Sequence, residues 1–381
     1  IIASGAMERP LVFNNNDRPG IILSSSIKKY IDFYGVKCGQ KISLFTNNDS
    51  AYEAAISLNN SGVIVNSVID IRDKTNSLIV KQAEKLGIKI HWKSSVVNTS
   101  GYKKINSIEI MKLSDDGAAV VGKKIKEECD CLGISGGWTP RVHLFTQSGG
   151  KLKFRDEDNV FLPDKSGLDQ ISIGSCNGDF ELDELIKNSV NLTNKFLKIN
   201  NNDYENLEII SSKEIDKKNI WLLPSDKPLG KTKPFLDFQN DSTANDIKLA
   251  LREGFKSIEH VKRYTTTGMA TDQGKLSNMH ALGIIAETAG VKMGELGTTT
   301  FRPPYTPLTF GAIVGRNVGE LFDITRRTPI HDWHVENKAK FENVGQWKRA
   351  WYYPINNENM HEAVQRESKA ARDSAGILDA S

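Results

Sequence analysis

The sequence predicts an α/β protein organised around a nucleotide-binding type of fold, and three stretches carry this prediction. A strand, a helix and a second strand follow one another between Lys41 and Arg72, which is the outline of a dinucleotide-binding unit. The segment 171–178 reads as a strand that ends in a tight turn and leads into a helix. Further along, the segment 242–261 carries a regular apolar stripe and marks a small helical region.

The composition is that of an ordinary globular protein. The chain has 381 residues, of which 39% are hydrophobic and 25% charged, and its net charge is +3. This length is too great for one compact core, so two or three domains are expected. The small net charge gives no argument for binding nucleic acid. Because no run of about 20 apolar residues occurs, we expect no membrane span.

The cysteines and the start of the chain indicate its setting. Cys129 and Cys131 are separated by one residue in a predicted strand, so they point to opposite faces and cannot pair easily. Sparse, reduced thiols fit a cytoplasmic protein best. The segment 1–6 reads as the end of a buried strand and has no initiator Met, so we expect an internal fragment of a longer polypeptide.

The first α/β unit has the right order of elements but lacks a phosphate-binding turn. A strand from Lys41, a helix over 50–58 and a strand over 63–70 follow in sequence. The turn at 46–51 contains none of the glycines of a dinucleotide fingerprint, and the carboxylate of Asp49 repels a pyrophosphate. We therefore expect a Rossmann-like unit whose own nucleotide site is empty or changed.

The middle of the chain returns toward the first nucleotide domain. The segment 105–121 alternates like a hairpin, and 128–138 reads as a returning strand. His143 follows in the segment 141–150. No carboxylate or nucleophile lies near His143 in the sequence, so we expect a packing role rather than a catalytic one.

The turn after the strand at 171–174 is the second candidate for nucleotide contact. Backbone amides at the start of the helix that follows, which we place over about 180–196, suit a phosphate or a ribose. The segments 1–6 and 171–178 resemble strand ends of flavoproteins with two dinucleotide-binding domains. In those proteins an aspartate usually follows the glycine, whereas Ser175 and Cys176 stand there in this chain. This difference argues against bound FAD at the turn.

A polar, linker-like run at 200–203 precedes the helical region. One helix over 242–261 is predicted to carry an apolar stripe, and a second helix is predicted over 277–289. The region is similar to a ferredoxin-like adaptor that binds an iron–sulfur cluster in some relatives. No cysteine follows Cys176, so thiolate ligands for a cluster are missing here and the adaptor should be structural.

Three runs in and around this region, 235–241, 261–275 and 297–307, carry the most specific signal. In the second run two cations are followed by hydroxyls and glycines, a composition found in phosphate- or flavin-facing loops but also in polar turns. Residue by residue, all three runs and the segment 141–150 closely resemble the α subunit of heterotetrameric sarcosine oxidase. In that family the region joins a nucleotide-binding module to a folate-binding module.

The last part of the chain resembles the start of the aminomethyltransferase fold, the folate domain of the same family. The resemblance rests on 327–334, 345–347 and 360–364. His331 and His334 are three residues apart, but a third ligand at helical spacing is missing, so we expect packing rather than metal binding.

The resemblance implies three domains. Residues 1–205 form an α/β domain of the pyridine nucleotide-disulfide oxidoreductase type, with a second Rossmann-like unit inserted at 27–136. Residues 206–315 form the helical adaptor without a cluster, and residues 316–381 begin the aminomethyltransferase-like domain. The acidic residue that clasps folate in that family would lie beyond Ser381.

The resemblance also implies cofactor contacts. In the family the 171–178 turn lies beside NAD, so we expect NAD contacts at Ala3, Gly5, Gly174, Ser175, Asn177, Gly178, Phe180 and Leu182. FMN lies between the α and β subunits, and its phosphate needs cations and donors. We expect these at Lys262, Arg263, Thr265, Thr266, Thr267, Lys275 and Arg302. If Arg263 instead paired with Glu259, the exposed ion pair would be worth only about 0.3–0.5 kcal/mol.

By resemblance, the complete enzyme oxidises sarcosine to glycine, transfers the methyl carbon to tetrahydrofolate and reduces oxygen to peroxide. Its partners would be the β, γ and δ subunits, and the β subunit would carry the substrate-oxidising FAD. Two alternatives stay open. The chain could belong to a related amine or imino-acid dehydrogenase that oxidises proline, an opine or glycine, or it could be a non-catalytic scaffold in which NAD is structural.

Overall fold

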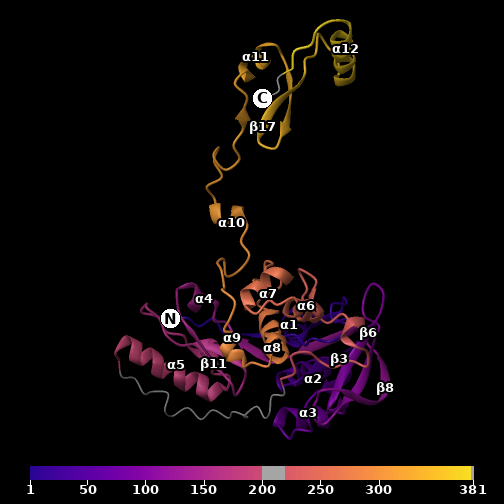
Figure 1. Ribbon diagram of the computed structural model, residues 1–381, viewed down its shortest axis with the longest axis vertical. Coiled ribbons are helices and arrows are strands. Elements are labelled where there is room, and N and C mark those ends of the chain that lie inside the picture. The colour runs from indigo at the N-terminus through magenta and orange to yellow at the C-terminus, as the bar shows by residue number, and fades with distance from the viewer. Residues whose placement is uncertain (200–218, 379–381) are drawn as a thin grey trace. The chain divides into compact units, whose positions relative to one another are not determined.

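The computed structural model describes residues 1–199 and 219–378 and divides into two compact units, Ile1–Pro307 and Leu308–Ser381 (Figure 1). The predicted linker at 200–203 and the predicted boundary at 205 lie outside the described residues. The three-domain organisation therefore stays a prediction. Among the described residues, no helix is both long and apolar enough to cross a membrane.

A five-stranded parallel sheet forms the centre of the first unit and confirms the predicted α/β class. Its strands lie in the order β2 (Ile21–Leu23), β9 (Cys131–Ser135), β3 (Lys41–Thr46), β4 (Ile64–Asp70) and β5 (Ile90–His91). The helices that alternate with these strands are α1 (Ser24–Tyr34), α2 (Ser50–Asn60) and α3 (Leu78–Lys85). The order strand, helix, strand predicted for 41–72 is therefore present.

The two faces of this sheet belong to different cores, because side chains alternate along a strand. Ile42 and Leu44 of β3 pack in a core with side chains of α1, α2 and α3. Phe45 packs in a second core with the antiparallel sheet of β6 (Ser94–Ser100), β7 (Ser107–Leu113) and β8 (Val120–Glu128). Cys129 lies in the second core and Cys131 in the first, and both thiols are free.

Shorter elements join the start of the chain to the 171–178 turn. Strand β1 (Ala6–Glu8) pairs with β10 (Trp138–Pro140), followed by α4 (His143–Gln147) and the hairpin of β11 (Leu152–Arg155) and β12 (Val160–Pro163). The predicted strand over 1–6 is largely wrong, because before Ala6 only Ile2 makes a bridge, to Ser172. That bridge leads into the 3₁₀ turn η1 (Gly174–Asn177) and α5 (Leu182–Leu197), which is the helix predicted there.

The helical region begins after η2 (Leu229–Lys231) with β13 (Phe235–Asp237) and β14 (Ser242–Thr243). The prediction of one helix over 242–261 is wrong: α6 (Ala244–Arg252) and α7 (Ile258–Thr265) are separate. The chain turns at Gly254, whose φ of 98° is left-handed and ends α6. The apolar stripe continues across the break because Ile247, Leu251, Phe255, Ile258 and Val261 all join one core.

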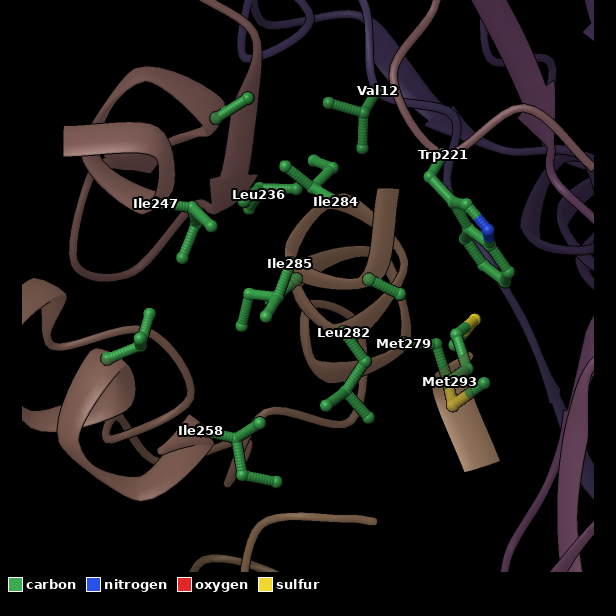
Figure 2. Close-up of a cluster of buried hydrophobic side chains, with 14 of the residues drawn as sticks. Val12, Trp221, Leu236, Ile247, Ile258, Met279, Leu282, Ile284, Ile285 and Met293 are labelled. Atoms are coloured by element: carbon green, nitrogen blue, oxygen red, sulfur yellow. The ribbon is translucent and has the colours of Figure 1, made fainter. Parts of the chain in front are cut away.

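Helix α8 (Asn278–Ala289), predicted over 277–289, lies at the centre of this core (Figure 2). Side chains around it come from distant parts of the sequence, including Val12, Trp221, Leu236 and Ile247. The short helix α9 (Met293–Leu296) follows and contributes Met293. Helices α6 and α8 contact each other, as do α6 and α7, so these three helices form one cluster (Figure 1).

The second unit is smaller. It contains α10 (Phe310–Val314), α11 (His331–Glu336), α12 (Met360–Asp373) and a three-stranded sheet in the order β15 (Arg326–Arg327), β17 (Trp347–Tyr352) and β16 (Lys340–Val344). Helix α12 begins with a capping box between Asn359 and Glu362, which satisfies amides of its first turn. His334 is buried, and its Nδ1 is hydrogen-bonded to the hydroxyl of Tyr353.

The close approach of Trp221 to α8 gives a first prediction. A Cβ at position 283 would lie 2.2 Å from the indole ring of Trp221, so Gly283→Ala should force the ring or the helix to move. We expect a loss of about 1–3 kcal/mol in the free energy of unfolding, although Ala is the better helix former. Chemical denaturation measures this loss.

Gly230→Ala is the matched control, because no atom lies within 4 Å of the Cβ it would add and the residue does not have a positive φ. If Gly283→Ala is as stable as the control, the packing of Trp221 on α8 is wrong.

Candidate functional site

A pocket lies beside the predicted nucleotide turn in the first unit. Its volume is about 370 Å³, and its walls come from β1, the start of α2, β10 and the η1–α5 connection. Of the predicted NAD residues, Ser175 and Phe180 line this pocket. The other lining residues are Ala6, Asp49, Ser50, Glu53, Ile79, Trp138 and Glu181.

The remaining predicted NAD residues surround the turn without lining the pocket. Ala3 and Leu182 are exposed, and Gly5 accepts a hydrogen bond from the amide of Arg141 through its carbonyl. Gly174 and Gly178 have φ of 72° and 90°, so they allow the chain to enter and leave the 3₁₀ turn in conformations that other residues rarely adopt. Asn177 is half-buried between them.

The electrostatics of this pocket favour neutral donors over phosphate. Asp49, Glu53 and Glu181 line it, and the first turn of α5 carries Asp183 and Glu184. Carboxylates at the start of a helix already interact with its positive end, and they repel a pyrophosphate there. The hydroxyls of a ribose and the amino or amide groups of a nucleoside can donate to such carboxylates.

The turn at 46–51 is filled by its own polar side chains. Thr46, Asn47 and Asn48 are buried. The amide of Asn48 donates to the hydroxyl of Ser135 over 2.9 Å, and the hydroxyl of Thr46 donates to the carbonyl of Asn48 over 3.0 Å. The backbone amides of Asn47, Asn48 and Ser50 donate to the carbonyl of Ser135, the hydroxyl of Thr46 and the side-chain oxygen of Asn48, respectively, so these amides are not free to bind a phosphate.

Arg72 occupies the end of the neighbouring strand and completes this arrangement. Its guanidinium lies 2.8 Å from Asp49 and 2.8 Å from Asp70, and only 2% of its side chain is exposed. The hydroxyl of Tyr52 donates to Asp70 over 2.8 Å. Burial opposes the charge of Arg72, but the hydrogen bonds and charges of Asp70 and Asp49 outweigh it and raise the pKa of Arg72. Asp49 therefore has a buried cation of the protein itself as its partner.

The predicted FMN residues of the 261–275 run lie around the end of α7. Lys262 is half-buried and Arg263 is exposed. Thr265 is buried, and its hydroxyl donates to the carbonyl of Val261 over 2.8 Å, while Thr266 ends the helix with a φ of 58°. The buried Thr267 bonds to the hydroxyl of Thr265 over 2.9 Å.

Acidic groups hold the same region in place. Asp237 accepts from the amide of Gly268 over 2.7 Å. Glu259, the alternative partner of Arg263, accepts from the amide of Thr300 over 2.6 Å. Of the cations expected to contact FMN, Arg263 and Arg302 are exposed and Lys262 is half-buried.

Lys275 differs from the other expected FMN residues, because it lines a small cavity that is also lined by His143. The ammonium of Lys275 donates to the carbonyls of Tyr305 and Asp272 and lies 4.6 Å from the centre of the Tyr305 ring. His143 packs against Phe301 with ring centres 4.1 Å apart. Burial lowers the pKa of His143, and the charges of Lys275 and Arg141 lower it too, so that it lies at about 4. The imidazole is therefore neutral near pH 7.

The residues that surround His143 could not be predicted from the sequence. Phe301, Tyr305 and Lys275 are 132 to 162 positions away along the chain, so no local pattern could show the contact. One signal for these contacts was available in the sequence: the segments 141–150, 261–275 and 297–307 all resemble the same protein family. Segments that line one cavity are expected to be constrained together.

Known proteins are similar to this chain over its whole length. Over its whole length the chain is 39% identical to the α chain of the sarcosine oxidase of Corynebacterium sp. strain P-1. The chain is homologous to sarcosine oxidase α subunits. The corresponding chain of Rhizobium meliloti strain 1021 is 36% identical, again over the whole chain. The chain spans 40% and 37% of these two relatives, respectively.

Family models and a solved structure match the predicted parts of such an α chain. The sarcosine oxidase A3 domain model matches residues 231–316, and the GCVT N-terminal domain model matches residues 330–381. The structure of an L-proline dehydrogenase from P. horikoshii superposes on this chain with a TM-score of 0.57 and 18% sequence identity. The match covers 82% of this chain and 57% of the dehydrogenase chain. At this identity the likeness concerns the fold alone.

The ion-pair cluster around Arg72 gives a second prediction. Replacing Arg72 with Met leaves Asp49 and Asp70 buried without their cation. We expect the free energy of unfolding to fall by about 3–5 kcal/mol, the usual loss when one partner of a buried ion pair is removed. Asp49→Asn is the control, because it keeps the pair of Arg72 and Asp70 and should cost less. Equal losses in denaturant unfolding would show that Asp70 is not the main partner.

Proposed function

We propose that this chain is part of the α subunit of a sarcosine oxidase. The whole enzyme would oxidise sarcosine to glycine, transfer the methyl carbon to tetrahydrofolate as 5,10-methylenetetrahydrofolate and reduce oxygen to hydrogen peroxide. The observation that carries the proposal is the 39% identity over the whole chain. This identity extends through the nucleotide-type region, the A3 region and the start of the GCVT-type region.

NAD is the proposed nucleotide of the first unit. The pocket beside Ser175 and Phe180 fits a nucleoside portion, because the aromatic side chains of Trp138 and Phe180 and three carboxylates line it. The turn at 46–51 does not fit the pyrophosphate, since Arg72 is paired with Asp49 and the backbone amides of Asn48 and Ser50 already have acceptors within the protein. We therefore place the sugar hydroxyls near the carboxylates and the phosphates away from α2. Nicotinamide supplies hydride chemistry when bound.

FMN is proposed to contact the region around the end of α7, shared with a β subunit. Lys262 and Arg263 supply charge there, and of Thr265, Thr266 and Thr267 it is Thr266 that is exposed. The buried hydroxyls of Thr265 and Thr267 instead hold the loop in its shape. Arg302 is a further exposed cation, while Lys275 faces the cavity.

The remaining features of the proposal concern the complete polypeptide. Tetrahydrofolate would bind the aminomethyltransferase-like domain, of which residues 330–381 match the N-terminal model. We assign none of the residues of this chain to folate. The proposed partners are β, γ and δ subunits in a cytoplasmic heterotetramer, and the β subunit would select the amine.

A related amine dehydrogenase is the second candidate. Over 71 residues, 19% of the chain, it is 34% identical to one of the subunits of an opine oxidase from Rhizobium meliloti strain 1021. This match is much shorter than the match to the sarcosine oxidase relatives. A shared region of this size is compatible with an opine or an imino acid as substrate.

The third prediction tests function and nucleotide together. The full-length polypeptide purified with its co-expressed partners should consume oxygen with sarcosine and release glycine and hydrogen peroxide. Faster turnover with L-proline or an opine would support the second candidate instead. Acid denaturation of the isolated α subunit should release NAD, and release of FAD would contradict the assignment to the Ser175 pocket. If NAD is present but no amine reduces the flavins, the scaffold alternative is favoured.

The fourth prediction concerns Lys262 and Arg263, the two cations in the last turn of α7. In the assembled complex, Lys262→Ala and Arg263→Ala should each weaken FMN binding roughly ten- to a hundredfold, as expected for the loss of about 1.5–3 kcal/mol from a charge-assisted contact. FMN retained after dialysis, measured by fluorescence, reports the loss. Lys256→Ala removes an exposed cation before α7 and is the matched control. Full FMN content and normal turnover in both variants would show that these residues are structural.

A further inference from the structure

The cavity that contains His143 has mostly apolar walls with several polar side chains among them, and very little room. Its boundaries come from β10, α4, the start of α8 and the segment 298–301. The space inside that the centre of a water-sized sphere can reach is about 20 Å³, which leaves room only for a very small occupant. The polar side chains around it belong to Thr139, His143, Lys275, Asn278, Thr298 and Thr299.

Several of these groups are buried without a partner. Only 4% of His143 is exposed, and neither of its ring nitrogens has a hydrogen-bond partner among the described residues. The hydroxyl of Thr139 and the Nε of the nearby Arg141 are also buried and have no hydrogen-bond partner among the described residues. A buried polar group without a partner is costly, and native proteins usually supply one. The wall of the cavity thus holds donors that a bound molecule would satisfy.

The charge around the cavity has one sign. Lys275 is a cation in its wall, and Arg141 is close enough to lower the pKa of both Lys275 and His143. Asp272 raises the pKa of Lys275, but it is not in the wall, and among the described residues no Asp or Glu lines the cavity. The ammonium of Lys275 has three donors, and protein carbonyls take two of them. Within the described part of the chain, the third donor has no carbonyl partner, although the ammonium also lies over the Tyr305 ring.

We propose that this cavity binds one small monoanion, either a halide or the carboxylate of a molecule as small as formate. The ammonium of Lys275, the hydroxyl of Thr139 and a ring N–H of His143 are its donors. Excess positive charge selects an anion over water, and the small volume excludes inorganic phosphate and larger carboxylates. The proposal rests on Thr139, His143 and Lys275 alone and is independent of the amine substrate of the enzyme.

Binding of an anion has a consequence for His143. The imidazole is neutral because of burial and because Lys275 and Arg141 repel a proton, which places its pKa at about 4. A bound anion offsets both cations, so the pKa of His143 rises when the site is filled. By linkage, the anion binds more tightly as pH falls toward that pKa.

Bromide provides the structural test. Crystals of the full-length protein in its complex, soaked in sodium bromide, should show an anomalous peak inside the cavity within hydrogen-bond distance of Lys275 and Thr139. Lys275→Met should remove the peak, whereas the matched variant Lys275→Arg, which keeps the charge, should retain it. Thr139→Val should weaken it. A water molecule at this position in wild-type crystals, or a peak that survives Lys275→Met, would overturn the proposal.

A titration separates this site from general salt effects and from a phosphate ligand. In the complex labelled with ¹³C at histidine Cε1, sodium formate should raise the pKa of His143, assigned with His143→Asn. His280 is the internal control: burial also lowers its pKa to about 4, but its Nε2 is bonded to Pro10 and it does not line the cavity. Equal shifts of both histidines, or an equal effect of inorganic phosphate at matched ionic strength, would contradict a small-anion site.

Discussion

The first unit depends on the burial of α8 on all sides. Every residue from Asn278 to Ala286 is buried, so the helix cannot be a surface element of an independent adaptor. His280 is bonded to the carbonyl of Pro10, and Trp221 packs over Gly283. One helix thereby holds together three parts of the chain: its start near Pro10, the segment around Trp221 and the helical region. The cavity that contains His143 lies at the N-terminal end of this helix, where Asn278 and Met279 form part of its wall.

Sequence periodicity was sufficient for several elements of the fold, because these elements depend on local pattern. The parallel strands at 41–46 and 64–70 and the helix between them follow from short-range alternation. The break at Gly254 was missed for an equally physical reason. Two helices that pack on one core keep their apolar residues in a common series, so the stripe runs through the turn that separates them.

The candidate sites were less accessible from sequence, because their important contacts are distant along the chain. The absence of glycine at 46–51 suggested a changed nucleotide turn, but the cation that pairs with Asp49 comes from Arg72, two residues after the end of β4. The row of threonines suggested donors to a phosphate. Its sequence could not show that the hydroxyl of Thr265 is directed back to the carbonyl of Val261. The partners of His143 were equally hidden.

The placement of the cysteines makes the thiols a built-in reporter of opening. Burial raises the pKa of Cys129 and of Cys131 to about 12, and Cys176 is buried as well. Cys38 is the thiol that remains partly exposed. Since alkylation proceeds through the exposed thiolate, Cys38 is the position where a probe attaches under native conditions. The other three cysteines become reactive only when their surroundings open, and Cys129 and Cys131 then report separately on the two faces of the central sheet.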